Sequence, residues 1–156
     1  MKAEKNLARL GIELPEPPQP AGAYLPCRKT GNLIYISGQG CRINGKLKYQ
    51  GKVGKDLSIE EAYDAARICC INALSILKGE LGDLDNINKI VNVHGFVNSA
   101  SGFTAQPQVV NGASEMLIEV FGDKGKHSRC ALASCELPNN IPVELEMIVE
   151  VVDNND

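Results

Sequence analysis

The 156-residue sequence predicts a two-layer α+β domain, with two main helices on one face of a mixed sheet of about six strands. Two long segments repeat apolar residues at helical spacing, and several shorter segments are β-branched or alternate apolar with polar residues. The two kinds of segment are interleaved along the chain. Because each helix and each half-buried strand has one apolar face, we expect these faces to pack together as two layers.

Residues 1–20 are expected to form an N-terminal extension, and residues 21–153 a single domain. A short amphipathic helix is predicted over 3–11, where apolar residues recur at helical spacing. The proline-rich stretch 14–20 follows as a stiff connector, because proline lacks a backbone N–H and disfavours helix in the residue before it.

The domain begins with a predicted hairpin, whose strands cover 23–28 and 33–37 on either side of a turn at 29–32. A second turn is predicted at Asn44–Gly45, a pair that readily adopts the left-handed backbone of tight hairpins.

Two long helices are predicted over 58–78 and 104–121. Ser58 and Glu61 have the spacing of a capping box, which marks the start of the first helix. Small residues along one face of that helix would let it approach the sheet closely. Gly122 is the expected C-terminal cap of the second helix.

Three further strands are predicted over 87–97, 129–136 and 143–152. The last one alternates Val, Leu and Met with glutamates, which is typical of a half-buried strand. The final two strands are joined by residues 137–142 and are expected to pair antiparallel with each other.

The composition disfavours several functional classes. Sixteen Lys and Arg residues against nineteen Asp and Glu give a net charge of −3, so nucleic-acid binding is not expected. No apolar run approaches the ~20 residues that span a bilayer, and the charged N-terminus does not resemble a signal peptide, so we expect a cytoplasmic protein without membrane association. No phosphate-binding glycine motif or C-x-x-C pair is present, and no metal or cofactor is expected.

Arg129 is the first candidate for a binding residue, since it begins an apolar strand and its guanidinium offers a two-pronged donor to a carboxylate. Glu144 lies near the start of the following strand. From the residues alone, an ordinary surface salt bridge is the simpler interpretation. His94 is expected to be a hydrogen-bonded residue of the sheet, and a metal site at His127 is a weak alternative.

Five segments occur together in a characteristic order: Ser37–Gln39, Gly51–Ala62, Ser128–Ala131, Glu136–Pro138 and Val143–Glu146. With these segments the chain resembles the RidA/YjgF family of reactive intermediate deaminases, often labelled endoribonuclease L-PSP, over about residues 21–152. It is most similar to a longer branch of the family that has an N-terminal helix and a His-x-Arg sequence.

The resemblance implies a chorismate-mutase-like fold that assembles as a homotrimer. The sheets would form an inner barrel with the helices outside, and the sites would lie in clefts between subunits. Whether three or six subunits associate stays open at this point.

The resemblance also implies roles for individual residues. Arg129 would grip the substrate carboxylate, and Glu144 would hold the attacking water or transfer protons. The residues expected to bind substrate are Tyr24, Gly38, Asn111 and Pro138.

The implied reaction is hydrolysis of a 2-imino or enamine acid to a 2-oxo acid and ammonium, without metal or organic cofactor. Archetypal members have a cysteine two residues after the arginine, where this chain has Ala131. This difference leaves open a non-catalytic trimer that binds a small carboxylate metabolite. A weaker alternative, an endoribonuclease, is kept because of the family label.

Overall fold

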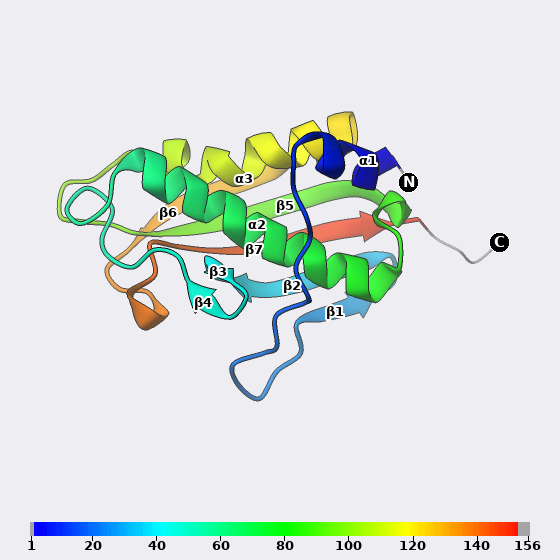
Figure 1. Cartoon of the computed structure of the whole chain (residues 1–156), viewed down its shortest axis with the longest axis horizontal. Coiled ribbons are helices and arrows are strands. Elements are labelled where there is room, and N and C mark those ends of the chain that lie inside the picture. The colour runs from blue at the N-terminus through cyan, green and yellow to red at the C-terminus, as the bar shows by residue number, and fades with distance from the viewer. Residues whose placement is uncertain (1, 153–156) are drawn as a thin grey trace.

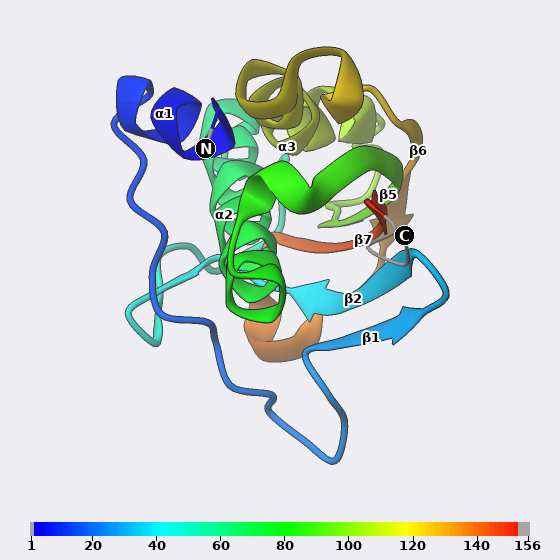
Figure 2. The same ribbon diagram turned by 90° about the vertical axis from the view of Figure 1, so that its right-hand side faces the viewer.

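Three helices lie on one face of a five-stranded sheet in the computed structural model, which describes residues 2–152 (Figures 1 and 2). The helices are α1 (Lys2–Arg9), α2 (Ile59–Leu81) and α3 (Gln106–Phe121). The sheet has the order β1-β2-β7-β5-β6, formed by Cys27–Thr30, Leu33–Gln39, Val143–Val151, Ile87–Asn98 and Ser128–Ser134. The predicted α+β class is confirmed, with five strands in the main sheet rather than about six.

A separate two-stranded sheet is formed by β3 (Arg42–Ile43) and β4 (Lys46–Leu47). Its turn is the predicted Asn44–Gly45 pair, whose φ angles of 50° and 78° are both left-handed. Single turns of 3-10 helix occur at Leu84–Asn86, Gly122–Gly125 and Pro138–Asn140.

The boundaries follow local backbone chemistry. The capping box at Ser58 is present, with the Ser58 side chain and the Glu61 side chain each bonded to the other's backbone N–H. Helix α2 continues past the predicted end at residue 78 and stops before Gly82, whose φ is 72°. Gly122, with a φ of 62°, caps α3 as predicted.

The first strand was predicted too early. Only Cys27–Thr30 pair with β2, and residues 23–26 are irregular. Pro26 has no N–H to give to a ladder, which explains why regular pairing begins after it. Helix α1 likewise ends at Arg9, two residues before Gly11 with its φ of 68°.

The N-terminal segment packs on the helical layer. Ala3 and Leu7 of α1 are buried in the same core as the rest of the domain. The proline-rich connector then crosses α2 (Figure 1), where the Ser75 hydroxyl donates a 2.6 Å hydrogen bond to the Pro15 carbonyl. This route brings residues 18–24 towards the lower edge of the sheet.

The two main helices touch each other through Gly112 of α3. A Cβ at that position would overlap the carbonyl oxygen of Tyr63 on α2. The close approach of the two helices thus needs a residue without a side chain at position 112.

The predicted antiparallel pairing of the last two strands is wrong. Strand β5 lies between β6 and β7, parallel to β6 and antiparallel to β7. Helix α3 is the crossover of a β-α-β unit, which places β6 beside β5 in parallel. The link 135–142 is long enough to cross the end of β5, a distance of about 10 Å.

The sheet has one face covered by helices and one that these helices leave uncovered, which we call the open face (Figure 2). Buried Val143, Leu145 and Met147 point to the helices, so Glu144 and Glu146, which alternate with them, point to the open face. Arg129 lies opposite buried Val93 and shares the helix-covered face. No helix within residues 2–152 is long and apolar enough to cross a membrane.

Candidate functional site

Four of the six residues predicted for the site line one pocket of about 250 Å³: Tyr24, Gly38, Pro138 and Glu144. The pocket, here called the Glu144 pocket, is bounded by the end of the connector, the β3–β4 hairpin and the 3-10 turn after β6. The structure therefore brings together residues that are up to 120 positions apart (144 − 24) in the sequence.

Glu144 is seated against the backbone of Gly38. The pairing of β2 with β7 shifts register between Ile36, opposite Met147, and Gln39, opposite Leu145, which makes an irregularity in β2 opposite Glu146. Such bulges re-aim side chains and are frequent beside active sites. A Cβ at position 38 would overlap the Glu144 Oε1, so the glycine leaves the space that the carboxylate occupies.

Pro138 belongs to a strained turn that a buried amide holds in place. Asn139 and Asn140 have left-handed φ angles of 56° and 55°. Asn98, which is fully buried, donates from Nδ2 to the Asn140 Oδ1 at 3.0 Å and accepts at Oδ1 from the Lys52 Nζ at 2.9 Å. Sequence reasoning missed Asn98, because nothing local distinguishes it from a strand-end asparagine.

The Glu144 carboxyl has an environment suited to proton transfer. It is half-buried, and this burial raises its pKa, with a further contribution from the negative charge of Glu146. Among residues 2–152, no N–H or O–H group donates a hydrogen bond to its oxygens. The carboxyl is thus free to bond to a ligand or water, and its pKa lies closer to neutral pH than that of an ordinary glutamate.

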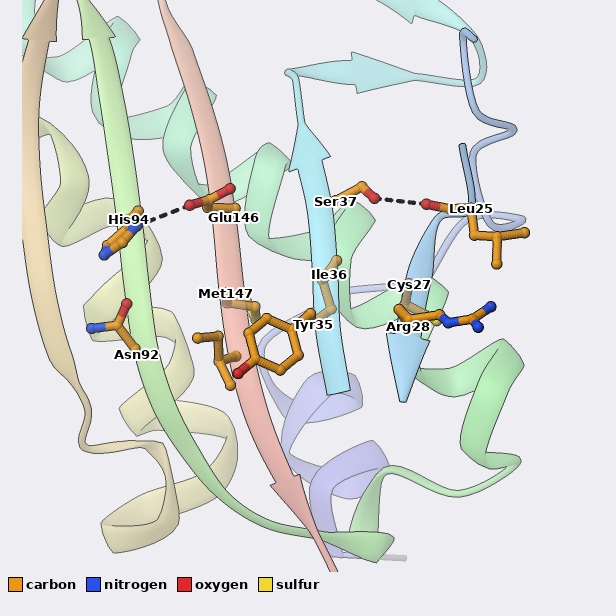
Figure 3. Close-up of a pocket in the computed structure, with 11 residues that line it drawn as sticks. Leu25, Cys27, Arg28, Tyr35, Ile36, Ser37, Asn92, His94, Glu146 and Met147 are labelled. Carbon is orange, nitrogen blue, oxygen red and sulfur yellow. Dashed lines mark hydrogen bonds and ion pairs between the residues drawn. The ribbon is translucent and has the colours of Figure 1, made fainter. Parts of the chain in front are cut away.

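Glu146, by contrast, is already engaged. Its Oε1 lies 2.9 Å from the His94 Nδ1, and both side chains border a wider hollow of about 460 Å³ on the open face (Figure 3). The expectation that His94 is a hydrogen-bonded residue of the sheet is confirmed. Tyr35 and Asn92 line the same hollow, which is distinct from the Glu144 pocket.

Arg129 lies elsewhere, beneath α3. Its Nη1 donates to the Asn111 Oδ1 at 2.7 Å and to the Ser114 Oγ at 3.2 Å, and its Nη2 donates to the Pro107 carbonyl at 3.4 Å. No carboxylate in the described chain pairs with it, so the surface salt bridge considered for Arg129 and Glu144 is wrong. Asn111 contacts the guanidinium and does not line the Glu144 pocket.

A chain of hydrogen bonds continues from Arg129 to His127. Because the Gly125 carbonyl only accepts, the His127 Nδ1 donates to it at 2.7 Å. In a neutral imidazole the Nε2 then accepts from the Ser114 hydroxyl at 2.9 Å, and the same hydroxyl oxygen accepts from Arg129. This arrangement needs a neutral imidazole. Burial and the nearby Arg129 charge lower the pKa of His127, which favours that form.

Within one chain, Arg129 and Glu144 point to opposite faces of the sheet, and their strands are separated by β5. A ligand in the Glu144 pocket therefore does not meet the Arg129 of the same chain.

The weak alternative of a metal site at His127 gains no support from the structure. His127 takes part in the hydrogen bonds described above, and no group of three His, Cys, Asp or Glu side chains in residues 2–152 could hold a metal ion.

Comparison with known proteins identifies the family. A family model described as "YjgF/chorismate_mutase-like, putative endoribonuclease" matches residues 4–151. The chain belongs to this family. The resemblance inferred from the sequence segments is thereby confirmed, and the α+β fold agrees with that of the solved family members.

Several relatives are similar over nearly their whole length. "Protein TCP17" of Trypanosoma cruzi is 38% identical over 147 residues, which cover 94% of this chain and 92% of that protein. A solved protein of unknown function from Agrobacterium tumefaciens is 38% identical, with a TM-score of 0.89 and coverage of 96% and 92%. A structure described as "a putative endoribonuclease" from Shewanella oneidensis is 34% identical, with a TM-score of 0.94 and coverage of 97% and 100%.

Removal of the neighbouring negative charge should lower the pKa of Glu144. We expect Glu146→Gln to move the carboxyl titration of Glu144, followed by carbon-13 NMR, to lower pH, since the ionised form is no longer disfavoured by repulsion. Glu150→Gln is the matched control, because six residues along a strand separate it by about 20 Å from Glu144. An unchanged titration in Glu146→Gln would contradict the assignment of Glu146 as a perturbing charge.

His127 should titrate below the ordinary histidine value of 6.5 and carry its proton on Nδ1 when neutral. Nitrogen-15 NMR reports both properties. Arg129→Gln should raise this pKa, whereas Arg28→Gln on the opposite edge strand should not. Because the unfolded chain binds this proton first as the pH falls below 6.5, the stabilisation from His127 is present above that pH and declines below it. A pKa above 6.5 would refute the neutral chain of hydrogen bonds.

Proposed function

We propose that the protein hydrolyses reactive 2-imino or enamine acids to 2-oxo acids and ammonium. The observation that supports this most strongly is the half-buried Glu144 carboxyl at the wall of a small pocket, with its raised pKa and no hydrogen-bond donor from residues 2–152. The imine carbon is already electrophilic, so the reaction needs a placed water molecule and a group that exchanges protons.

Glu144 can serve both halves of the reaction. As a carboxylate it accepts a proton from water while the water oxygen forms a bond to the imine carbon. As a carboxylic acid it returns that proton to the nitrogen, which gives a carbinolamine. The carboxylate then takes the hydroxyl proton of the carbinolamine and passes it to the nitrogen, so the carbonyl double bond forms as the carbon–nitrogen bond breaks, and ammonia leaves to be protonated in solution. No electrons are transferred to or from the substrate, and the thiol that Ala131 replaces takes no part in these steps.

The substrate carboxylate is assigned to Arg129 of a neighbouring subunit. The Arg129 guanidinium is held by neutral acceptors, so its charge is available to an anion. The open face of the sheet also bears Tyr35 and Leu132, which are 46% and 54% exposed in the single chain. A homotrimer that covers the open face would bury Tyr35 and Leu132. If it also brings Arg129 to the Glu144 pocket of the next subunit, the available charge of Arg129 has an anion to bind.

Endoribonuclease activity is the competing candidate, because the family description and the Shewanella oneidensis structure carry that word. The two histidines do not support it as an acid–base pair, since His94 is on the open face and His127 is bonded to α3. A non-catalytic metabolite-binding trimer uses the same Arg129, and turnover separates it from the enzyme.

Substitution of either functional residue should abolish or slow turnover of freshly generated 2-iminobutyrate. We expect no measurable turnover in Arg129→Ala, and a kcat at least ~100-fold lower in Glu144→Gln, the scale of a lost general acid–base group. Arg28→Ala and Glu150→Gln are matched controls outside the site. Equal rates in wild type and both site variants would leave the binding interpretation.

Mixed oligomers test whether the site is shared between subunits. Arg129→Ala and Glu144→Gln chains, co-refolded in equal amounts, should recover activity at about a quarter of the sites, because a functional site needs an intact Arg129 from one chain and an intact Glu144 from its neighbour. Light scattering should give a mass of three chains. Inactivity of the mixture would show that each site belongs to one chain.

A further inference from the structure

Arg42 is the one cationic side chain among the described residues that line the Glu144 pocket. It begins β3, opposite Leu47, which lines the pocket too. Neither the sequence motifs nor the roles assigned above involve it. Arg42 borders the pocket that Glu144 also borders, and on its other side it borders a second hollow next to Leu14 and Asn72.

The backbone around Arg42 is fixed from within the protein. Asn72 of α2, which is only 4% exposed, donates from its Nδ2 to the carbonyl oxygens of Gly40 and Arg42, at 3.0 and 2.9 Å. One buried amide thus ties the strand that enters the hairpin to the helical layer. The start of β3 is therefore set by the core and does not depend on the exposed turn.

The Arg42 guanidinium retains most of its bonding capacity. Its Nη1 donates to the Gly45 carbonyl at 3.1 Å, which orients the side chain along the hairpin. No carboxylate within residues 2–152 forms an ion pair with it. A guanidinium has five N–H donors, so those that remain can form a two-pronged bond to an anion in the pocket.

We infer that Arg42 binds the distal carboxylate of a dicarboxylic 2-imino or enamine acid of four or five carbons. The inference rests on the proposed function, in which the neighbour's Arg129 holds the carboxylate next to the imine. The pocket volume of about 250 Å³ lies below the ~300–1,000 Å³ of sites for drug-sized ligands, which suits such a small metabolite.

Electrostatics favours a second anion only because Arg42 is present. A distal carboxylate that enters this pocket meets the negative form of Glu144, and two like charges at short range repel each other. Arg42 offsets that repulsion with a charge-assisted hydrogen bond. A substrate with an apolar tail would gain nothing from the guanidinium and would cover its unpaired donors, which carries a desolvation cost.

The first test compares two substrates generated in place by an amino-acid oxidase: 2-iminoglutarate and 2-iminobutyrate. We expect wild type to prefer the dicarboxylate in kcat/KM, and Arg42→Gln to reduce that preference by ~10–100-fold, the range for a lost hydrogen bond to a charged group. Lys46→Gln is the matched control, because it removes a cation from the same hairpin that does not line the pocket. The same preference in Arg42→Gln as in wild type would overturn the inference.

The second test does not depend on turnover. Calorimetric titration with the stable products 2-oxoglutarate and 2-oxobutyrate measures binding alone. We expect Arg42→Gln to bind 2-oxoglutarate ~10–100-fold more weakly than wild type, and Lys46→Gln to bind it as wild type does. If this result is obtained although wild type hydrolyses neither imine, the proposed function fails while Arg42 remains the residue that binds the distal carboxylate. An unchanged Kd for 2-oxoglutarate in Arg42→Gln refutes the anchor whatever the activity.

Discussion

The alternation of side chains along β7 determines where chemistry can occur in this protein. Val143 and Leu145 are buried beneath the helices. Because successive side chains of a strand point to opposite faces, Glu144 between them points to the open face. A slip of one residue would reverse every side chain of the strand, so the hydrophobic core itself holds the glutamate in position. The irregularity at Gly38 then supplies the local space that the carboxylate needs.

The same geometry separates the two residues on which the proposed reaction depends. Arg129 is on an edge strand and faces α3, whereas Glu144 is on a central strand and faces away from the helices. No rearrangement of side chains alone can bring them together, because the sheet lies between them. Catalysis that uses both residues therefore requires a second copy of the chain, so the proposed activity depends on assembly.

Local features of the fold could be predicted from the sequence, and features that depend on distant pairing could not. The capping box at Ser58, the cap at Gly122 and the Asn44–Gly45 turn each follow from the conformational preferences of a few neighbouring residues. The place of β6 in the sheet depends on β5 filling the gap beside β7, which no local pattern records. The family resemblance supplied the candidate site residues, but it did not reveal that Arg129 and Glu144 lie on two faces of the sheet.

The contacts that the sequence did not indicate share a physical character. They are made by neutral side chains that form hydrogen bonds to residues distant in the sequence: Asn98, Asn72 and Ser114. They position charged groups without neutralising them.

Arg129 illustrates why this matters. A carboxylate partner would hold the guanidinium equally well, but it would compete with any anionic ligand. Asn111, Ser114 and the Pro107 carbonyl orient the fork and leave its full positive charge unpaired within residues 2–152. The neutral His127 next to Ser114 has a similar effect. A protonated imidazole could no longer accept a hydrogen bond from the serine hydroxyl, and it would place a second positive charge beside that of Arg129. Among residues 2–152 the Arg129 guanidinium is held by neutral acceptors, so its orientation is fixed while its charge stays available to an anion.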